Sequence, residues 1–240
     1  MSNSYRILPH LPMSPSNSSP TRILLPFVIL LPILLAACGV PPLAGPTPAP
    51  TPITTPFAGV REDPQRLTLI QTDLPEGFRK LDNTSLHEGH NAVLFMNPDA
   101  VSGKSDDLVL GVVDEITTYE DDADARDAFE NDLLLTAEDI ANKIKESDSA
   151  APDSIEVQVY HPELKGADLL RSFKASYKLG DTLVNEYRYQ FMVSNAIGNV
   201  IVTVRANEDG GESESGRAQA DAIAQAQIDK LNEFRISPSQ

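Results

Sequence analysis

The chain has 240 residues and a formal net charge of −16, with 35 acidic residues against 19 lysines and arginines. This balance excludes a nucleic-acid-binding function, because binding to DNA depends on neutralising phosphates with Lys and Arg. Cys38 is the single cysteine. The sequence therefore also excludes a disulfide framework, a CxxC redox motif and a cysteine-rich zinc site.

The N-terminal third of the chain differs from the rest. An uncharged apolar run over residues 23–37 follows Arg22 and contains Pro26 and Pro32. A positive residue before a short apolar run is typical of a secretory signal peptide, whereas a membrane-spanning helix needs about 20 apolar residues. A spanning anchor is the alternative interpretation, and translation can begin at Met1 or at Met13.

The apolar run ends in Leu35-Ala36-Ala37-Cys38, a branched apolar residue, two small residues and a cysteine. This motif resembles the lipobox of bacterial lipoproteins. The resemblance implies cleavage between Ala37 and Cys38 and diacylglycerol on the Cys38 sulfur, with palmitate among the attached acyl chains. This would place the protein on the extracytoplasmic side of the cell membrane as a cell-envelope lipoprotein. Two or three acyl chains anchor a protein stably where one does not.

Residues 38–63 are rich in proline and threonine and favour an extended polyproline II stalk. A proline-rich ligand for a partner is the alternative, but no basic residue flanks the prolines. We therefore divide the chain into a signal peptide, 1–37, a lipidated linker, 38–63, and one extracytoplasmic domain, 64–240. Removal of Arg6 and Arg22 with the signal leaves 17 basic against 35 acidic residues, a formal charge of −18.

The first half of the domain predicts helices and strands in mixed order. Asp63-Pro64 is a helix cap followed by a first-turn proline and predicts a short helix through Ile70, and 74–78 is a predicted turn. Strands are expected over 92–96 and, from apolar alternation, over 108–117. Acids at Asp121 and Asp122 favour a helix start. The apolar stripe that follows predicts one helix of five turns, formed by Ala125, Phe129, Leu133, Ala137, Ile140 and Ile144.

The second half predicts mostly strands. Apolar and polar residues alternate over 155–159, 172–179, 186–193 and 200–205, as in strands with one buried face. Gly180-Asp181 and residues 195–199 are predicted turns, so consecutive hairpins are expected. A last helix over 214–234 follows. The predicted fold class is α+β, with a mostly antiparallel sheet of about five to six strands packed against two main helices that cover its apolar face.

Three segments of the domain resemble motifs of known lipoprotein domains. Residues 73–78 (DLPEGF) resemble a DLPxGF opening, and 118–129 (TYEDDADARDAF) resemble a strand end followed by a DAxxAxxAF helix. Residues 197–204 (IGNVIVTV) resemble an xGNVVVxV strand before a final helix. Together they are similar to the extracellular sensor and LpqN/PsbP-like domains of Gram-positive-type lipoproteins over most of 67–234. The resemblance implies a fold and an exported setting, and it implies no ligand.

The best metal candidate in the sequence is the segment containing His87, Glu88 and His90, which brings two imidazoles and a carboxylate together. Their spacing differs from the His-Glu-x-x-His pattern of zinc enzymes, so we favour a solvated polar loop and assign no metal and no cofactor. Nucleophile-elbow, phosphate-loop and dinucleotide motifs are absent from the sequence. We predict that the protein is not an enzyme.

Four basic residues fall on the polar phase of three successive predicted strands: Lys174, Lys178, Arg188 and Arg205. If those strands are neighbours, the four share one sheet face and are candidates for binding an anionic ligand or an acidic protein partner. The alternative is a solvated face on which Glu156 and Glu186 balance the charge.

The sequence therefore predicts a lipid-anchored extracytoplasmic binding or sensor-like module whose ligand it does not identify. Two other interpretations stay open. One is a structural lipoprotein of the cell envelope, and the other is a hydrolase whose active site is assembled from distant residues.

Overall fold

A seven-stranded antiparallel sheet organises the chain in the order β2-β3-β4-β8-β7-β6-β5. The computed structural model describes residues 59–106, 108–132, 136–147, 154–207 and 210–236. Cys38, the predicted signal peptide and most of the predicted linker lie outside these residues. The elements are β1 (Gly59–Val60), α1 (Pro64–Leu67), β2 (Arg79–Thr84), β3 (His90–Met96), α2 (Pro98–Val101), β4 (Val109–Thr118), α3 (Asp122–Asp127), α4 (Ala137–Ser147), β5 (Glu156–Val159), β6 (Leu169–Leu179), β7 (Thr182–Val193), β8 (Ala196–Arg205), α5 (Glu214–Glu233) and β9 (Arg235–Ile236).

The path of the chain through the sheet explains this strand order. β2, β3 and β4 run from one edge to the middle, and the segment with α3 and α4 then leads to β5 at the opposite edge. From there β6, β7 and β8 return to the middle, where β8 pairs with β4. The predicted α+β class with a mostly antiparallel sheet is confirmed, although the sheet has more strands than predicted.

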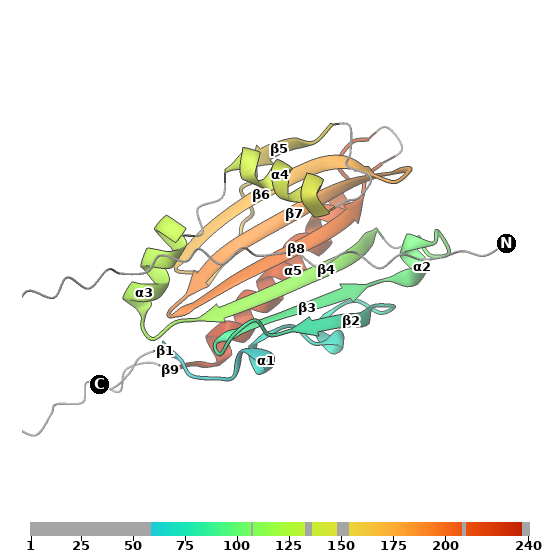
Figure 1. Cartoon of the computed structure of the whole chain (residues 1–240). Helices are drawn as coiled ribbons and strands as arrows, with labels where there is room; N and C mark the ends of the chain where they lie inside the picture. Colours follow the sequence, from blue (N-terminus) through green and yellow to red (C-terminus); the bar gives the residue numbers. More distant parts are fainter. Residues whose placement is uncertain (1–58, 107, 133–135, 148–153, 208–209, 237–240) are drawn as a thin grey trace, which may run out of the picture. The chain divides into compact units, whose positions relative to one another are not determined.

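Helices cover both faces of the sheet, which corrects the expectation of a single covered face. On one face, Ile228 of α5 packs in a core cluster with Tyr187 and Val202. On the other face, Phe129, just after α3, packs with Met192. Figure 1 shows α5 behind the central strands and α3 and α4 in front of them. The central strands are therefore buried on both sides.

The single five-turn helix predicted after Asp121 is wrong, because the structure has two helices there. α3 ends at Asp127, a π-helical turn covers Ala128–Asp132, and α4 begins at Ala137. A reciprocal cap starts α4: the amide of Asp139 donates to Oγ1 of Thr136, and the amide of Thr136 donates to Oδ2 of Asp139. The residues of the predicted apolar stripe pack into two separate core clusters, one with Phe129 and the other with Ile140.

The described fold begins within the segment predicted as linker. Gly59 and Val60 of β1 pair with Ile236 and Arg235 of β9, so the two ends of the described chain meet (Figure 1). Asp63 then caps α1, as predicted, and its side chain accepts a hydrogen bond from the Gln65 amide at 2.9 Å. Among the described residues, no helix is long and apolar enough to span a membrane.

Candidate functional site

The four basic candidates do not share a face of the sheet, so that prediction is wrong. Lys174 lies opposite Tyr187, on the face covered by α5. Arg188, the next residue along β7, lies opposite Phe173 on the other face. Because neighbouring residues of a strand point to opposite faces, the register separates Lys174 from Arg188.

Two of these cations already form ion pairs with carboxylates. Nζ of Lys174 lies 3.3 Å from Oε2 of Glu212, and Nε of Arg188 lies 2.6 Å from Oε1 of Glu186. The Arg188 and Glu186 side chains are only 14% and 8% exposed. This pair contributes to the interior of the domain and presents no free charge to an anionic partner.

The remaining two cations are also apart. Lys178 lies on the α5 face opposite Leu183 and is exposed, whereas Arg205 lies opposite Val184 on the other face. The guanidinium of Arg205 donates a hydrogen bond to the carbonyl oxygen of Ala100 in α2. The four positions therefore form no common site.

The histidine segment, in contrast, lines an open cleft of about 440 Å³. Three parts of the chain form its walls: the residues around the start of α1, the loop between β2 and β3, and the end of β4. We call it the acidic cleft, and its lining consists of Glu62, Asp63, Pro64, Gln65, Ser85, His87, Glu88, Gly89, His90 and Thr118. The lining has three carboxylates and no lysine or arginine. Arg66, outside the lining, pairs with Glu62 at 2.8 Å, and the Asp63 side chain accepts from the Gln65 amide. The remaining negative charge favours a ligand with positive charge or hydrogen-bond donors.

His90 has a fixed orientation beside this cleft. Its Nδ1 accepts a hydrogen bond from the Leu86 amide at 3.3 Å, so Nε2 is the nitrogen that donates to Oε1 of Glu115 at 2.8 Å. Nδ2 of Asn199 donates to the other oxygen of Glu115. Both ring nitrogens of His90 are therefore occupied, which leaves neither lone pair for a metal ion.

His87 contributes differently to the same wall. Its ring centroid lies 5.4 Å from that of His90, and its Nδ1 lies 2.7 Å from the carbonyl oxygen of Glu88. Within the described residues, no group of three or more His, Cys, Asp or Glu side chains is arranged to hold a metal ion. The arrangement supplies a polar wall with an imidazole facing solvent.

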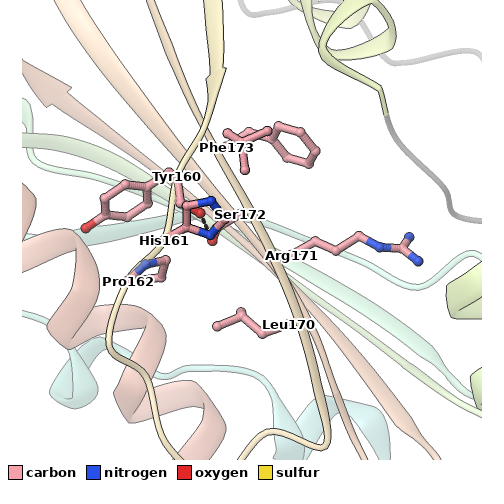
Figure 2. A pocket seen from close by; sticks show the side chains of 8 residues that line it. Tyr160, His161, Pro162, Leu170, Arg171, Ser172 and Phe173 are labelled. Atoms are coloured by element: carbon pink, nitrogen blue, oxygen red, sulfur yellow. Dashed lines mark hydrogen bonds between the residues drawn. The ribbon is translucent and has the colours of Figure 1, made fainter.

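A second, smaller pocket of about 240 Å³ lies beside the β5 edge of the sheet. Figure 2 shows Tyr160, His161 and Pro162 on one side of it and Leu170, Ser172 and Phe173 on the other. Arg171 also lines this pocket, but its guanidinium is turned away from it. The guanidinium stacks over the Phe129 ring at 4.3 Å and donates to the Phe129 carbonyl oxygen. This pocket is smaller than the roughly 300–1,000 Å³ of typical ligand sites.

Comparisons with known proteins do not identify a family. No protein-family model matches the chain, and no curated protein matches it. A crystal structure of an uncharacterised protein from Mycobacterium smegmatis is similar at 12% identity and a TM-score of 0.32, covering 73% of this chain and 90% of that one. No conclusion about function rests on so weak a similarity, and the resemblance to LpqN/PsbP-like domains stays a prediction.

Sequence reasoning missed a tyrosine cluster between the sheet and α5. The hydroxyl of Tyr160 donates to both oxygens of Asp221 at 2.9 and 2.7 Å, and that of Tyr189 donates to Oδ1 at 2.8 Å. The Tyr187 hydroxyl donates to Oε1 of Glu212 at 2.9 Å. Burial raises the pKa of all three phenols above the usual value, and these carboxylates raise it further. The cluster therefore fastens α5 to β7.

Proposed function

We propose that the protein is a lipid-anchored extracytoplasmic binding module whose acidic cleft receives a positively charged ligand. The observation that carries the ligand class is the lining: Glu62, Asp63 and Glu88 surround an opening of about 440 Å³ whose lining contains no lysine or arginine, and Arg66 outside it neutralises only Glu62 among the three. A volume of this size lies within the usual range for small ligands. An amine or a basic side chain of a partner protein has the chemistry to fit it.

The lipid anchor is supported by the sequence before the described fold. The lipobox-like Leu35–Cys38 motif and the proline-rich residues after it suit a domain carried on a stalk. The lining of the acidic cleft begins at Glu62, two residues after β1 and close in sequence to the proline-rich segment. This position favours a sensor-like role in which ligand binding affects the junction between that segment and the domain.

A non-enzymatic role fits the placement of the titratable groups better than a hydrolase does. Burial raises the pKa of Asp114 to about 7, the shift expected of a catalytic acid. However, Asp114 is fully buried and lines neither pocket, so a substrate in those pockets has no access to it. A purely structural envelope role does not account for the acidic cleft.

The anchor is tested by expressing the full chain and the Cys38→Ala variant in a bacterial host fed with labelled palmitate. The wild type is expected to incorporate label and to fractionate with membranes, whereas the variant is expected to remain unlabelled and uncleaved or to be released. Labelling and processing that are unchanged in Cys38→Ala would refute the lipoprotein part of the proposal.

The ligand class is tested with spermidine as the probe and the detergent-solubilised full chain. Because the chain is strongly acidic, a matched control is needed to separate the cleft from general charge attraction. Glu62→Gln with Glu88→Gln is expected to weaken binding about tenfold or more, whereas Glu156→Gln with Glu163→Gln, which removes two exposed charges outside the cleft, is expected to leave it nearly unchanged. Equal losses in both double variants would remove the cleft from the proposal.

A further inference from the structure

Side chains of the sheet and of α5 hold the short segment Leu67–Leu69, which begins at the last residue of α1. Nε2 of Gln227 donates to the Leu67 carbonyl oxygen at 2.8 Å, and Nζ of Lys230 donates to the Thr68 carbonyl oxygen at 2.7 Å. From the sheet, Oδ2 of Asp114 accepts from the Leu69 amide at 2.6 Å. Nδ2 of Asn91 donates to Oγ1 of Thr68 at 3.0 Å.

Three oxygen atoms of this arrangement lack a hydrogen-bond donor among the described residues: Oδ1 of Asn91, Oδ1 of Asp114 and Oε1 of Gln227. All three residues are 0% exposed. A buried acceptor without a donor destabilises the fold, and more so when it is charged. All three bind within Leu67–Leu69, so the arrangement has a local excess of acceptors over donors.

The charged groups near Asp114 do not offset its burial. Its strand neighbours on the same face are Val93 of β3 and Val200 of β8, which are apolar. Lys230 of α5 is the nearby cation, but its ammonium also lies 2.9 Å from Oδ2 of Asp73. Glu115 and Asp73 add negative charge, and burial outweighs the Leu69 hydrogen bond and Lys230 in raising the pKa.

We propose that Asp114 carries a proton in the folded chain and acts as a proton-operated latch on Pro64–Leu69, the segment whose first two residues form part of the acidic cleft. A proton on Oδ1 turns an acceptor into a donor and so reduces the local excess of acceptors to which Oδ1 of Asn91 and Oε1 of Gln227 belong. Loss of that proton leaves a buried carboxylate with a single hydrogen bond and weakens the hold on the segment.

Regulation of the acidic cleft by this latch rests on the proposed function. The latch itself is a property of the fold and does not depend on that function. The direction of the pH effect follows from the raised pKa. The closed segment keeps the proton up to about pH 7, whereas an open segment with an exposed Asp114 loses it near the ordinary value of 3.8. The free energy by which Asp114 keeps the segment closed is therefore largest below about pH 4, falls as pH rises, and becomes constant above about pH 7.

The first test is infrared spectroscopy of the full chain in detergent. A carboxylic-acid C=O band is expected that disappears with a midpoint near pH 7 and that Asp114→Asn lacks. Asp73→Asn, which removes an exposed carboxylate next to Lys230, is the matched control and is expected to keep the band. An ionised Asp114 throughout, with a water molecule or a cation supplying the donor, would overturn the latch.

The second test measures hydrogen exchange at the Leu69 amide. Relative to Asp114→Asn, which supplies a neutral NH₂ donor at every pH, protection in the wild type is expected to fall about tenfold per pH unit between about pH 4 and about pH 7. The Val202 amide in the sheet serves as an internal reference. A pH-independent ratio at Leu69 would contradict the latch.

The third test links the latch to the cleft. Spermidine affinity is expected to change across this pH range in the wild type more than in Asp114→Asn. Absence of spermidine binding at every pH, with the infrared and exchange results as expected, would refute the proposed ligand and leave the latch intact. Spermidine binding without a carboxylic-acid band from Asp114 would refute the latch and leave the proposed ligand intact.

Discussion

The side-chain amide of Asn195 forms two hydrogen bonds with the backbone of Val60, 135 residues away in the sequence. Its Oδ1 accepts from the Val60 amide at 2.6 Å, and its Nδ2 donates to the Val60 carbonyl oxygen at 3.2 Å. The same Nδ2 donates to the Tyr119 carbonyl oxygen at 2.7 Å. Asn195 lies in the β7–β8 turn and is 2% exposed. It therefore ties β1 to the turn between β7 and β8.

Replacement of this amide should destabilise the fold measurably. Asn195→Ala removes two hydrogen bonds to the Val60 backbone and one to the Tyr119 carbonyl oxygen, so the free energy of unfolding is expected to fall by about 2 kcal/mol. Asn131→Ala is the control, because the Asn131 side chain is exposed and donates to the exposed Asp127 on the helix surface; a change within about 0.5 kcal/mol is expected. Denaturant titration of both variants measures the difference, and equal effects would contradict the role of Asn195.

Arg188 and Lys178, which lie on opposite faces of the sheet, are expected to differ in their effect on stability. Arg188→Gln leaves the nearly buried Glu186 without its cation, and the remaining bond from the Tyr177 hydroxyl does not neutralise the charge. The free energy of unfolding is expected to fall by about 3 kcal/mol. Lys178→Gln changes an exposed residue and should have little effect. Thermal denaturation compares them, and similar melting temperatures would show that the Arg188–Glu186 pair contributes nothing.

Gly198 is required by the residue opposite it. It pairs with Phe191, and a Cβ at position 198 would overlap the Phe191 ring. Gly198→Ala is expected to cost about 3 kcal/mol, whereas Gly111→Ala, whose Cβ would meet only the Phe95 carbonyl oxygen at 3.4 Å, should cost less. In the Phe191→Leu background the penalty at Gly198 should shrink. An undiminished penalty there would locate the cause elsewhere.

The same glycine shows how far the sequence predicts the fold. Alternation identified β4, β6, β7 and β8, and spacing identified α5, because those signals are local. Gly198 suggested a turn over 195–199, but the turn lies at Ser194–Asn195 and β8 continues through Gly198. Only the facing ring explains that glycine, and pairing partners are not visible in the local pattern.

For a related reason, the sequence did not predict that both faces of the sheet are buried. Polar residues of β7 suggested a wet face, yet Asn185 and Glu186 are buried and receive hydrogen bonds from Ser176 and Tyr177 of the neighbouring strand. β2 escaped prediction because all six of its residues are exposed, so it has no apolar alternation. The acidic cleft combines three distant segments, and among its residues only the histidine segment was recognisable beforehand.

The tyrosine cluster predicts how the fold responds to alkali. Tyr187 and Tyr189 are 0% exposed, and burial raises their pKa well above the ordinary value near 10, with further contributions from Glu212 and Asp221 respectively. The folded chain therefore keeps protons that the unfolded chain releases. The stability that these phenols contribute is complete below about pH 10 and is lost as pH rises above it, by up to about 1.4 kcal/mol per pH unit for each phenol.

An absorbance titration of phenolate formation measures this directly. In the urea-unfolded chain the tyrosines should all ionise near pH 10, whereas in the folded chain Tyr160, Tyr187 and Tyr189 should ionise only as circular dichroism reports unfolding. Tyr189→Phe should remove one of these late phenols and leave the early part of the curve unchanged. Complete ionisation near pH 10 with the circular dichroism intact would show that Asp221 and Glu212 do not hold the hydroxyl protons in the folded protein.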